Sequence, residues 1–369
     1  MNKIFRVLLF IFGLVFIVAL IILFTLWMLS AGKAEPLKGQ DSKILPGSIS
    51  AIEKVSLGGL EQYIIIRGAD TTKPLMLFLH GGPGNPEFAF MKEANPEIEK
   101  LFLMVYWEQR GAGKSYSKNI DPESMNTEQL ISDTRELTEM LIQRFKKDRI
   151  YLAGHSWGSF LGILTADRYP RLYHAFIGIG QVCHQYRAHK ISYEWIKEKA
   201  KEKNDTQALE NISEISFPDS LAGSSEWIDF LRKERKYVNR YGGGITRNIK
   251  SRWPLALVVA KTKEYSLCDK ISYPRGAVFS LKHLWPEVIQ TNLFTRIDSL
   301  ELPAYIFQGK YDYQTPWIVA KDFFDHLKAP HKEFYTFSNS AHSPLFEEVE
   351  KFNYLLRNEV LIPDRHAGR

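Results

Sequence analysis

Cysteine is scarce in this chain of 369 residues, since only Cys183 and Cys268 occur. Two cysteines cannot build the disulfide framework of a small secreted domain, and neither lies at a spacing typical of a metal site. The pair is compatible with one disulfide outside the cytoplasm or with two buried free thiols. Stability must therefore come from an apolar core, and a chain of this ordinary composition is able to form one.

Long basic tracts are also missing. The formal net charge is +6, but the lysines and arginines are mostly interspersed with acidic residues. This distribution is typical of a solvated surface, and it excludes nucleic acid as an expected partner. Internal repeats and low-complexity segments are absent as well, and the length suggests two or three structural units.

Charge is absent from one long apolar run, which extends from Val7 to Leu29. As a helix, this run is long enough to cross the roughly 30 Å of hydrocarbon in a bilayer. The apolar region of a cleavable signal peptide is normally only about 7–15 residues long, although the small residues of "LSAGKA" leave cleavage open. We therefore predict a single transmembrane anchor in residues 1–30.

The charges that flank this run predict its orientation. Lys3 and Arg6 lie close before it, whereas Lys33, Lys38 and Lys43 follow it among acidic residues. Because lysine and arginine concentrate on the cytoplasmic side of a span, we predict a cytoplasmic N-terminus and an extracytoplasmic main domain.

After a polar linker at 31–49, apolar runs typical of strands alternate with helical patterns. Helices are predicted over 129–145 and 345–357. This alternation indicates an α/β fold with a mostly parallel sheet that helices cover on both faces. The strand-like runs are "EQYIIIRG", "PLMLFLHGG", "LFLMVYWEQRG", "RIYLAGHS", "HAFIGIGQV", "LPAYIFQGKYD" and "HKEFYTFSNSAH".

The alternation stops in residues 184–295, which are charged, aromatic and mostly helical in period. We predict that this segment is a helical cap inserted into one α/β domain. The two parts of the core are then residues 50–183 and 296–369.

Polar motifs follow several of the predicted strands, where functional residues of an open α/β sheet collect. "GHSWGS" places Ser156 in the pattern G-x-S-x-G directly after a strand. Taken alone, this serine is a nucleophile or an ordinary helix cap. "GKYDYQTP" places Asp312, and "SNSAHSP" places His342, after the last two strands. The order serine, aspartate, histidine is that expected of a catalytic triad on this architecture.

The chemistry of a triad requires each of these residue types. A serine hydroxyl is a weak nucleophile, so it needs an imidazole to take its proton and a carboxylate to orient that imidazole. The oxyanion that forms needs fixed N–H donors. We predict the backbone of Trp157 and of Gly82 in "HGGPG", in preference to Gly81, as these donors.

Other acidic, histidine and cysteine residues are weaker candidates for the catalytic site. Asp325 with His326 and His331 forms an acid–base cluster, but on an apparent helix. Asp133 occurs too early in the chain and on a predicted helix. Cys183 lacks a glycine turn around it.

Together, "HGGPG", "WEQRGAGKS", "GHSWGS", "GKYDYQTP" and "SNSAHSP" make the chain resemble the α/β-hydrolases of the proline iminopeptidase family of serine peptidases. The resemblance covers 50–182 and 302–369. It implies an α/β-hydrolase fold with a helical cap, Ser156 as nucleophile with Asp312 and His342 as partners, and neither metal nor organic cofactor. The N-terminal anchor makes this chain a membrane-bound variant.

Two departures from the family pattern concern the site. Glu108 stands where the family usually has aspartate, and "NPE" replaces the glycine-rich continuation of "HGGPG". Peptidases of this family use cap carboxylates to receive the free amino group of the substrate. The cap holds many such carboxylates, and none of them is assigned to this role from the sequence. They include Glu194, Glu198, Glu226, Glu234 and Glu287.

The sequence therefore predicts a membrane-anchored serine hydrolase. The resemblance implies an aminopeptidase that cleaves short peptides from the amino end through an acyl-enzyme. A carboxylesterase for small or lipid-derived esters remains an alternative, as does a ligand receptor that keeps the fold without turnover.

Overall fold

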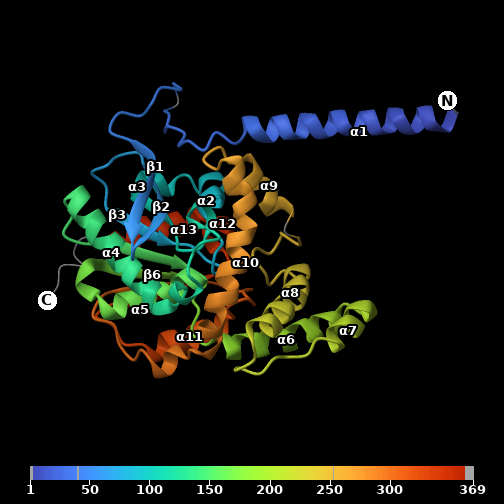
Figure 1. Cartoon of the computed structure of the whole chain (residues 1–369). Helices are drawn as coiled ribbons and strands as arrows, with labels where there is room; N and C mark the ends of the chain where they lie inside the picture. The colour runs from blue at the N-terminus through green and yellow to red at the C-terminus, as the bar shows by residue number, and fades with distance from the viewer. Residues whose placement is uncertain (1–2, 40, 252, 362–369) are drawn as a thin grey trace.

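The computed structural model describes residues 3–39, 41–251 and 253–361, and its centre is an eight-stranded sheet (Figure 1). The strands follow the order β1-β2-β4-β3-β5-β6-β7-β8 across the sheet. Strands β3 to β8 are mutually parallel, while β1 and β2 are antiparallel to their neighbours. The predicted mostly parallel sheet is thus confirmed. The strand bounds are Ile49–Leu57 (β1), Leu60–Gly68 (β2), Leu75–Leu79 (β3), Leu103–Glu108 (β4), Ile150–His155 (β5), Tyr173–Ile179 (β6), Ala304–Gly309 (β7) and Lys332–Phe337 (β8).

β1 is absent from the predicted strands. It lies at the edge of the sheet, where only Val55 and Leu57 of its side chains are buried, so it lacks the continuous apolar run of the inner strands. A two-residue turn joins it to β2. Both turn residues, Gly58 and Gly59, have positive φ angles (52° and 72°), as tight hairpins with this strand twist require.

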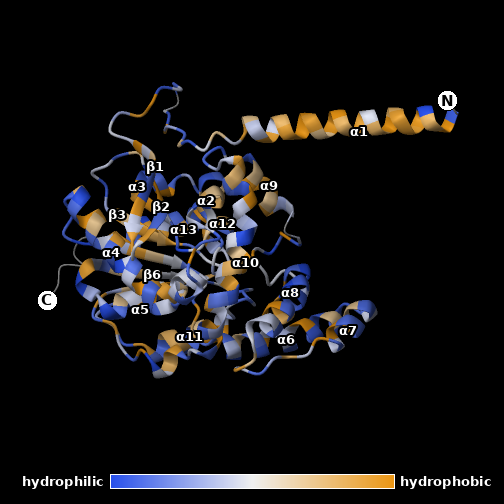
Figure 2. Cartoon of the chain, viewed as in Figure 1, coloured by the Kyte–Doolittle hydropathy of each residue, from blue (hydrophilic) through white to orange (hydrophobic). Residues whose placement is uncertain are grey.

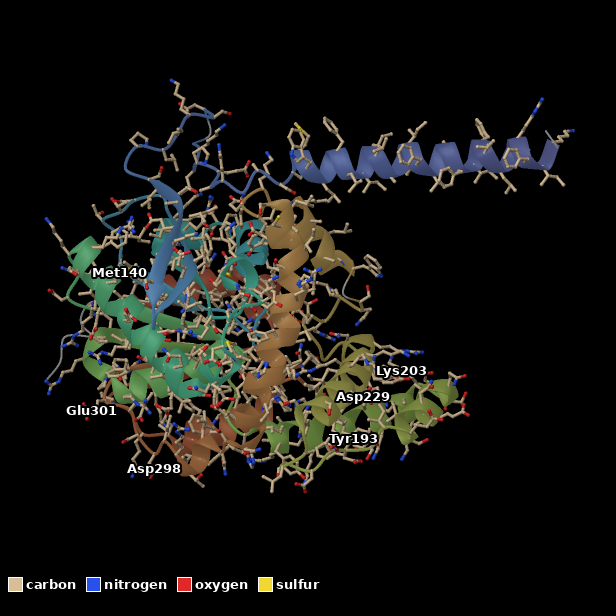
Figure 3. All side chains as sticks on the ribbon, in the orientation of Figure 1. Met140, Tyr193, Lys203, Asp229, Asp298 and Glu301 are labelled. Atoms are coloured by element: carbon tan, nitrogen blue, oxygen red, sulfur yellow. The ribbon has the colours of Figure 1, made fainter. Side chains whose placement is uncertain are left out.

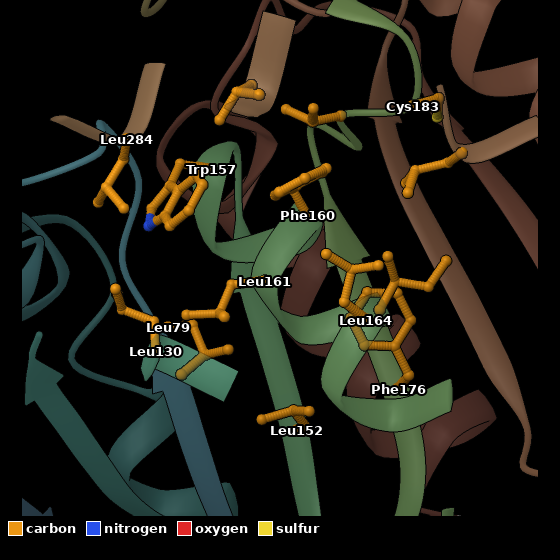
Figure 4. Close-up of a cluster of buried hydrophobic side chains, with 14 of the residues drawn as sticks. Leu79, Leu130, Leu152, Trp157, Phe160, Leu161, Leu164, Phe176, Cys183 and Leu284 are labelled. Carbon is orange, nitrogen blue, oxygen red and sulfur yellow. The ribbon is translucent and has the colours of Figure 1, made fainter. Parts of the chain in front are cut away.

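Helices cover both faces of the sheet. One face packs against α4 (Thr127–Phe145), α5 (Trp157–Arg168) and α11 (Trp317–His326). Figure 4 shows part of this layer, in which Trp157 and Leu161 of α5 lie beside Leu79 of β3. The other face packs against α2 (Phe88–Ala94), α3 (Ile98–Leu101), α12 (Pro344–Glu347) and α13 (Val349–Leu355). Because both faces are covered, strands such as β3 and β5 are buried along their whole length.

Between β6 and β7, the described residues form helices and turns and contain no named strand. Figure 1 shows α6–α8 gathered at one end of the molecule, and charged side chains such as Lys203 and Asp229 project from them in Figure 3. The predicted helical character is therefore present, whereas the cap boundaries at 184 and 295 stay a prediction. The helices are α6 (Gln185–Glu202), α7 (Thr206–Ser213), α8 (Ser224–Arg240), α9 (Trp253–Lys261) and α10 (Leu267–Gln290).

The first helix, α1 (Lys3–Met28), projects away from the domain, and its apolar side chains are exposed (Figure 2). Its length and composition are those of a membrane span, and a signal sequence near an N-terminus has the same properties. At the other end of the chain, the helix predicted over 345–357 is interrupted. It consists of α12, α13 and a π-helical turn at Leu356–Val360.

Candidate active site

Ser156 lies at a sharp turn between the end of β5 and the start of α5. Its φ of 55° and ψ of −121° are strained for a serine, and its backbone N–H donates to the Ile179 carbonyl at 2.8 Å. The Ser156 side chain makes no capping hydrogen bond to α5, every residue of which the structure describes. The alternative of a helix-capping serine therefore does not apply. Instead, the turn presents a partly exposed hydroxyl above the sheet.

The two glycines of the G-x-S-x-G pattern are required by close packing. A Cβ atom on Gly154 would lie 2.1 Å from the Gly158 carbonyl oxygen, and one on Gly158 would lie 1.9 Å from the Leu79 carbonyl oxygen. Any side chain at either position would force α5 away from β3 and β5. The pattern thus holds Ser156 tightly against the ends of the central strands.

Asp312 and His342 lie in the loops after β7 and β8, and their side chains meet. His342 Nδ1 is 2.8 Å from Asp312 Oδ2. Both side chains are buried. The carboxylate is also fixed from its own loop and from β7, since Thr315 donates to both of its oxygens and Gln308 Nε2 donates to Oδ2 at 2.9 Å. Because Asp312 accepts at Nδ1, the proton of a neutral His342 is held there and the Nε2 lone pair is left free.

The protonation states suit a general base beside a carboxylate. Burial alone would raise the pKa of Asp312, but the charge and hydrogen bond of His342, with the groups of Thr315, outweigh it and lower that pKa. Burial lowers the pKa of His342 below its usual 6.5 despite the opposing charge of Asp312. At neutral pH the pair is therefore a carboxylate with a neutral imidazole.

Behind this pair lies a second histidine, His155, which occupies a variable position of the G-x-S-x-G pattern. Its Nδ1 is 2.6 Å from Glu87 Oε1, and its Nε2 is 2.9 Å from the backbone oxygen of His342. Both partners are acceptors, so a protonated His155 satisfies both contacts. Burial alone would lower its pKa, but the charge and hydrogen bond of Glu87 outweigh it and raise the pKa of His155. The Glu87–His155 pair thus supports the loop that carries His342.

The "HGGPG" loop is tied to the start of α5 through Gln109. Gln109 accepts from Trp157 Nε1 at 2.8 Å and donates to the His80 carbonyl at 3.1 Å. Gly81 of this loop lies against the serine, because a Cβ atom added to it would be 3.1 Å from Ser156 Cβ. As the first residue of α5, Trp157 has a backbone N–H without an intrahelical acceptor. The loop and the helix start therefore both lie next to Ser156.

The cap touches the loops of Asp312 and His342 directly. Between α8 and α9, the carbonyl oxygen of Gly243 accepts from the backbone N–H of Tyr313 at 2.9 Å, and that of Gly244 accepts from His342 N–H at 3.1 Å. The ring of Trp195 in α6 stacks on Tyr313 with centroids 3.8 Å apart. A Cβ atom on Gly244 would lie 1.8 Å from Asn239 Oδ1, so this approach requires glycine.

Glu347 of α12 adds a further link between the cap and the His342 loop. It accepts from Arg247 N–H at 2.6 Å and from Ala341 N–H at 2.8 Å. Burial raises the pKa of Glu347 to about 7. These links join residues far apart in sequence, so no local motif predicts them.

The five cap glutamates named as amine-binding candidates lie in different surroundings. Glu287 accepts from the Thr127 N–H at 2.9 Å, and Glu234 is buried beside His189, whose Nδ1 is 2.8 Å away. Glu194 and Glu198 line a surface groove next to Tyr313, whereas Glu226 is exposed on α8.

One carboxylate outside the cap, that of Glu87, lies close to the serine. The Cβ position on Gly81 that is 3.1 Å from Ser156 Cβ is also 3.1 Å from Glu87 Oε1. Glu87 Oε2 is buried and has no hydrogen-bond partner among the described residues. Glu87 is the last residue of "NPE", where the sequence departs from the family pattern. This departure is the one feature of the sequence that draws attention to Glu87.

The competing groupings have other partners. Asp133 forms a buried ion pair with Arg110 at 2.8 Å. Asp325 pairs with Lys321 on the surface, and His326 lies 3.0 Å from Asp298. Cys183 is buried and Cys268 exposed, and both are free thiols. Burial raises the pKa of Cys183 well above its usual value, which disfavours a thiolate nucleophile. Glu108 is buried at the end of β4, and burial raises its pKa to about 7.

Comparison with known proteins agrees with this architecture. Residues 74–349 match the alpha/beta hydrolase fold family. The chain is 34% identical over 307 residues to a probable aminopeptidase, YbaC, of Bacillus subtilis, covering 83% of this chain and 94% of that one. It is 24% identical over 322 residues to the proline iminopeptidase of Lactobacillus crispatus, covering 82% and 96%. A solved structure, the proline iminopeptidase-related protein of Thermus thermophilus, aligns with a TM-score of 0.56 and 16% identity over 84% of this chain and 96% of that one.

The chain belongs to the alpha/beta hydrolase fold family. The predicted fold class and the resemblance to proline iminopeptidases are therefore confirmed, and so is the prediction of a hydrolase at the level of the family. The fold alone does not define the bond that is cleaved, because this architecture carries many chemistries.

Proposed function

We propose that the chain is a serine hydrolase in which Ser156 is the nucleophile, His342 the general base and Asp312 the group that orients His342. The contact between His342 Nδ1 and Asp312 Oδ2, together with the strained turn that leaves Ser156 partly exposed, is the observation that carries this proposal. The backbone N–H groups of Trp157 and Gly82 are the proposed oxyanion donors. Fixed donors of this kind contribute about 3–4 kcal/mol each to transition-state stabilisation.

The reaction then proceeds in two halves. Ser156 Oγ attacks the carbonyl carbon of the scissile bond while His342 Nε2 takes the hydroxyl proton. His342 passes this proton to the leaving amine as the C–N bond breaks, which leaves an acyl ester on Ser156. Water repeats the attack with the same base, and the acid and the free serine are released.

We propose an aminopeptidase acting on short peptides as the particular activity. The names of the similar proteins from Bacillus subtilis and Lactobacillus crispatus favour it. A free α-amino group has an unperturbed pKa of about 7.7–8.0, so it enters the site largely as a cation and needs a carboxylate partner when buried. Glu87 is suited to this role, because its Oε2 is buried without a hydrogen-bond partner in the described chain and its Oε1 lies near Ser156.

A substrate panel tests this activity. Free and N-acetylated prolyl, alanyl and leucyl arylamides are compared with short-chain aryl esters, using the full chain. We expect cleavage of the free amides and slow cleavage of the acetylated ones. Equal rates for free and acetylated amides would end the aminopeptidase proposal, and hydrolysis of esters alone would favour a carboxylesterase.

Reaction with a fluorophosphonate probe separates an enzyme from a receptor. We expect the wild-type chain to be labelled and the Ser156→Ala chain to remain unlabelled. A wild-type chain that does not react would contradict the triad and favour a ligand receptor on the same fold.

We further propose that α1 remains attached and anchors the hydrolase outside the cytoplasm. The length of α1 and the placement of Lys3 and Arg6 at its start support this location. Protease added to intact cells or spheroplasts should digest the main domain. Protection until the membrane is broken would reverse the orientation, and a released chain beginning near Lys33 would reveal a cleaved signal.

A further inference from the structure

Exposed apolar side chains outside α1 are concentrated in one stretch of the chain. Nine large apolar side chains are exposed in the described residues beyond α1, and four of them fall within 253–278. The four are Trp253, Leu257, Ile271 and Val278, which are 77%, 55%, 49% and 62% exposed. Scattered single residues need no explanation, but four exposed large apolar side chains in one short stretch of two consecutive helices indicate an interaction surface.

The helical spacing places these side chains in two stripes. Trp253 and Leu257 are four residues apart on α9, and Ile271 and Val278 are seven apart on α10, so each pair shares one face of its helix. α9 reads "WPLALVVAK", with a single charged residue at its end. Its inner side packs through Val259 against the domain. The outer side of α9 therefore has the composition of a core helix in an exposed position.

The end of α1 is tied to the junction between α9 and α10. Gly32 N–H donates to the Lys263 carbonyl at 2.8 Å, and Lys270 Nζ donates to the Leu29 carbonyl at 2.7 Å. Glu35 pairs with Lys92 at 2.6 Å and with Lys263 at 2.9 Å. Figure 1 shows α9 beside the point where α1 leaves the domain. The residues that directly follow α1 therefore contact the chain that directly follows α9, so the apolar helix ends close to the apolar surface of α9.

We propose that the outer faces of α9 and α10, defined by Trp253, Leu257, Ile271 and Val278, lie in the headgroup region of the bilayer that holds α1. The inference rests on the anchoring role of α1 in the proposed function. Tryptophan concentrates in this region of membranes, and a helix lying in the interface buries its apolar face there. Lys261 and Arg275 are exposed on the same two helices, and their cationic ends can bind the phosphate groups of lipid headgroups.

Contact with the bilayer has a consequence for the cap. α10 passes from the membrane side to the core, where Ser280 Oγ donates to the Gly111 carbonyl at 3.0 Å. A bilayer bound to α9 and α10 would therefore hold the cap at the membrane surface. The enzyme would meet peptides that are bound to, or released at, that surface.

Site-directed spin labelling in proteoliposomes tests the proposal. The full chain carries Cys268→Ser, so that buried Cys183 is its remaining natural cysteine, and a single Leu257→Cys receives the label. The vesicles contain phosphatidylethanolamine and anionic phosphatidylglycerol. Power saturation then compares collisions with oxygen, which partitions into lipid, and with a nickel chelate, which stays in water. Circular dichroism spectra and melting curves that match wild type establish that each variant is folded.

Two matched positions calibrate the result. Val15→Cys in α1 reports the bilayer core, and Leu221→Cys, which is 77% exposed between α7 and α8, reports water. We expect the ratio of oxygen to nickel collisions at position 257 to exceed that at position 221 several-fold.

The remaining outcomes each overturn the proposal in a different way. A position 257 as accessible to nickel as position 221, with position 15 in lipid, would leave the anchor intact and refute the docking of α9. An aqueous position 15 would refute the anchor itself. Spin–spin coupling at position 257 that persists when the protein is diluted in lipid would instead assign the surface to a second copy of the chain. None of these outcomes bears on the serine chemistry, which the fluorophosphonate probe measures separately.

Discussion

The core and the cap of this protein differ in whether local sequence or long-range contacts determine the surroundings of their functional residues. In the core, each proposed catalytic residue follows a strand, and the local sequence determines its surroundings: Gly154 and Gly158 permit the Ser156 turn, and Thr315 fixes Asp312 from three residues away. In the cap, the residues that contact the candidate site are far in sequence from the residues they bind. Gly243 and Gly244 accept hydrogen bonds from the two loops that carry Asp312 and His342. We therefore expect the core to determine the reaction chemistry, including amine recognition by Glu87, and the cap to position the loops that carry Asp312 and His342.

Removing the core carboxylate should have the largest effect. In Asp312→Asn, an amide donates where a carboxylate accepts, so His342 is driven to the tautomer that cannot take the serine proton. We expect kcat to fall by about 10⁴, the loss known for such a change in a serine triad. The matched control is Asp325→Asn, which changes a surface aspartate paired with Lys321 and should leave kcat unchanged. Similar activities in the two variants would remove Asp312 from the triad.

Separate substitutions of one core glutamate and one cap glutamate test directly which of the two regions binds the substrate's amine. Glu87→Gln should lower kcat/KM for free-amine substrates by one to a few powers of ten, at about 1.4 kcal/mol for each. The rate with N-acetylated substrates should change much less, and this contrast separates amine binding from general damage to the His155 support. Glu234→Gln is the cap counterpart and should preserve the preference for free amines. A loss of that preference in Glu234→Gln alone would assign amine recognition to the cap.

The pH profile should show a displaced acid limb. His342 acts as a base only when it is neutral, and burial lowers its pKa below 6.5. We therefore expect kcat/KM to remain high down to pH 6.5 and to fall about tenfold per pH unit only below the lowered pKa. Initial rates across the pH range in buffers of constant ionic strength measure this limb. A midpoint above 6.5 would mean that another group governs activity.

The smallest effect concerns the link between Glu347 and the cap. Burial raises the pKa of Glu347 in the folded chain to about 7, above its usual value of 4.5, so the folded chain binds more protons than the unfolded chain between these values. The free energy of unfolding contributed by this group must then fall as pH rises from about 4.5 to about 7. Glu347→Gln should flatten that decline, as chemical denaturation at several pH values would reveal. An unchanged pH slope in the variant would contradict the assignment.

The strands and the proposed triad were predictable because each depends on local sequence. Buried parallel strands require continuous apolar runs, and Ser156 and Asp312 closely follow the buried strands β5 and β7. His342 follows β8, a half-buried edge strand that its aromatic residues still indicate. β1 escaped prediction because an edge strand buries few side chains, although Gly58 and Gly59 mark its hairpin.

The supporting contacts could not be predicted in the same way. The pairing of Glu87 with His155 joins residues 68 positions apart, and nothing in the spacing of either one indicates the other. The same holds for Glu347 and Arg247, which are 100 positions apart. Such contacts follow from the tertiary arrangement of loops, so they emerge only once the strands are placed side by side.

The most direct test of the central claim locates the covalent adduct itself. The full chain is treated with a fluorophosphonate, digested, and analysed by mass spectrometry of its peptides. The account predicts one adduct per chain on the peptide that contains Ser156, and none in Ser156→Ala, while Ser213→Ala on the cap surface reacts as wild type does. An adduct on another serine, or undiminished labelling of Ser156→Ala, would contradict it.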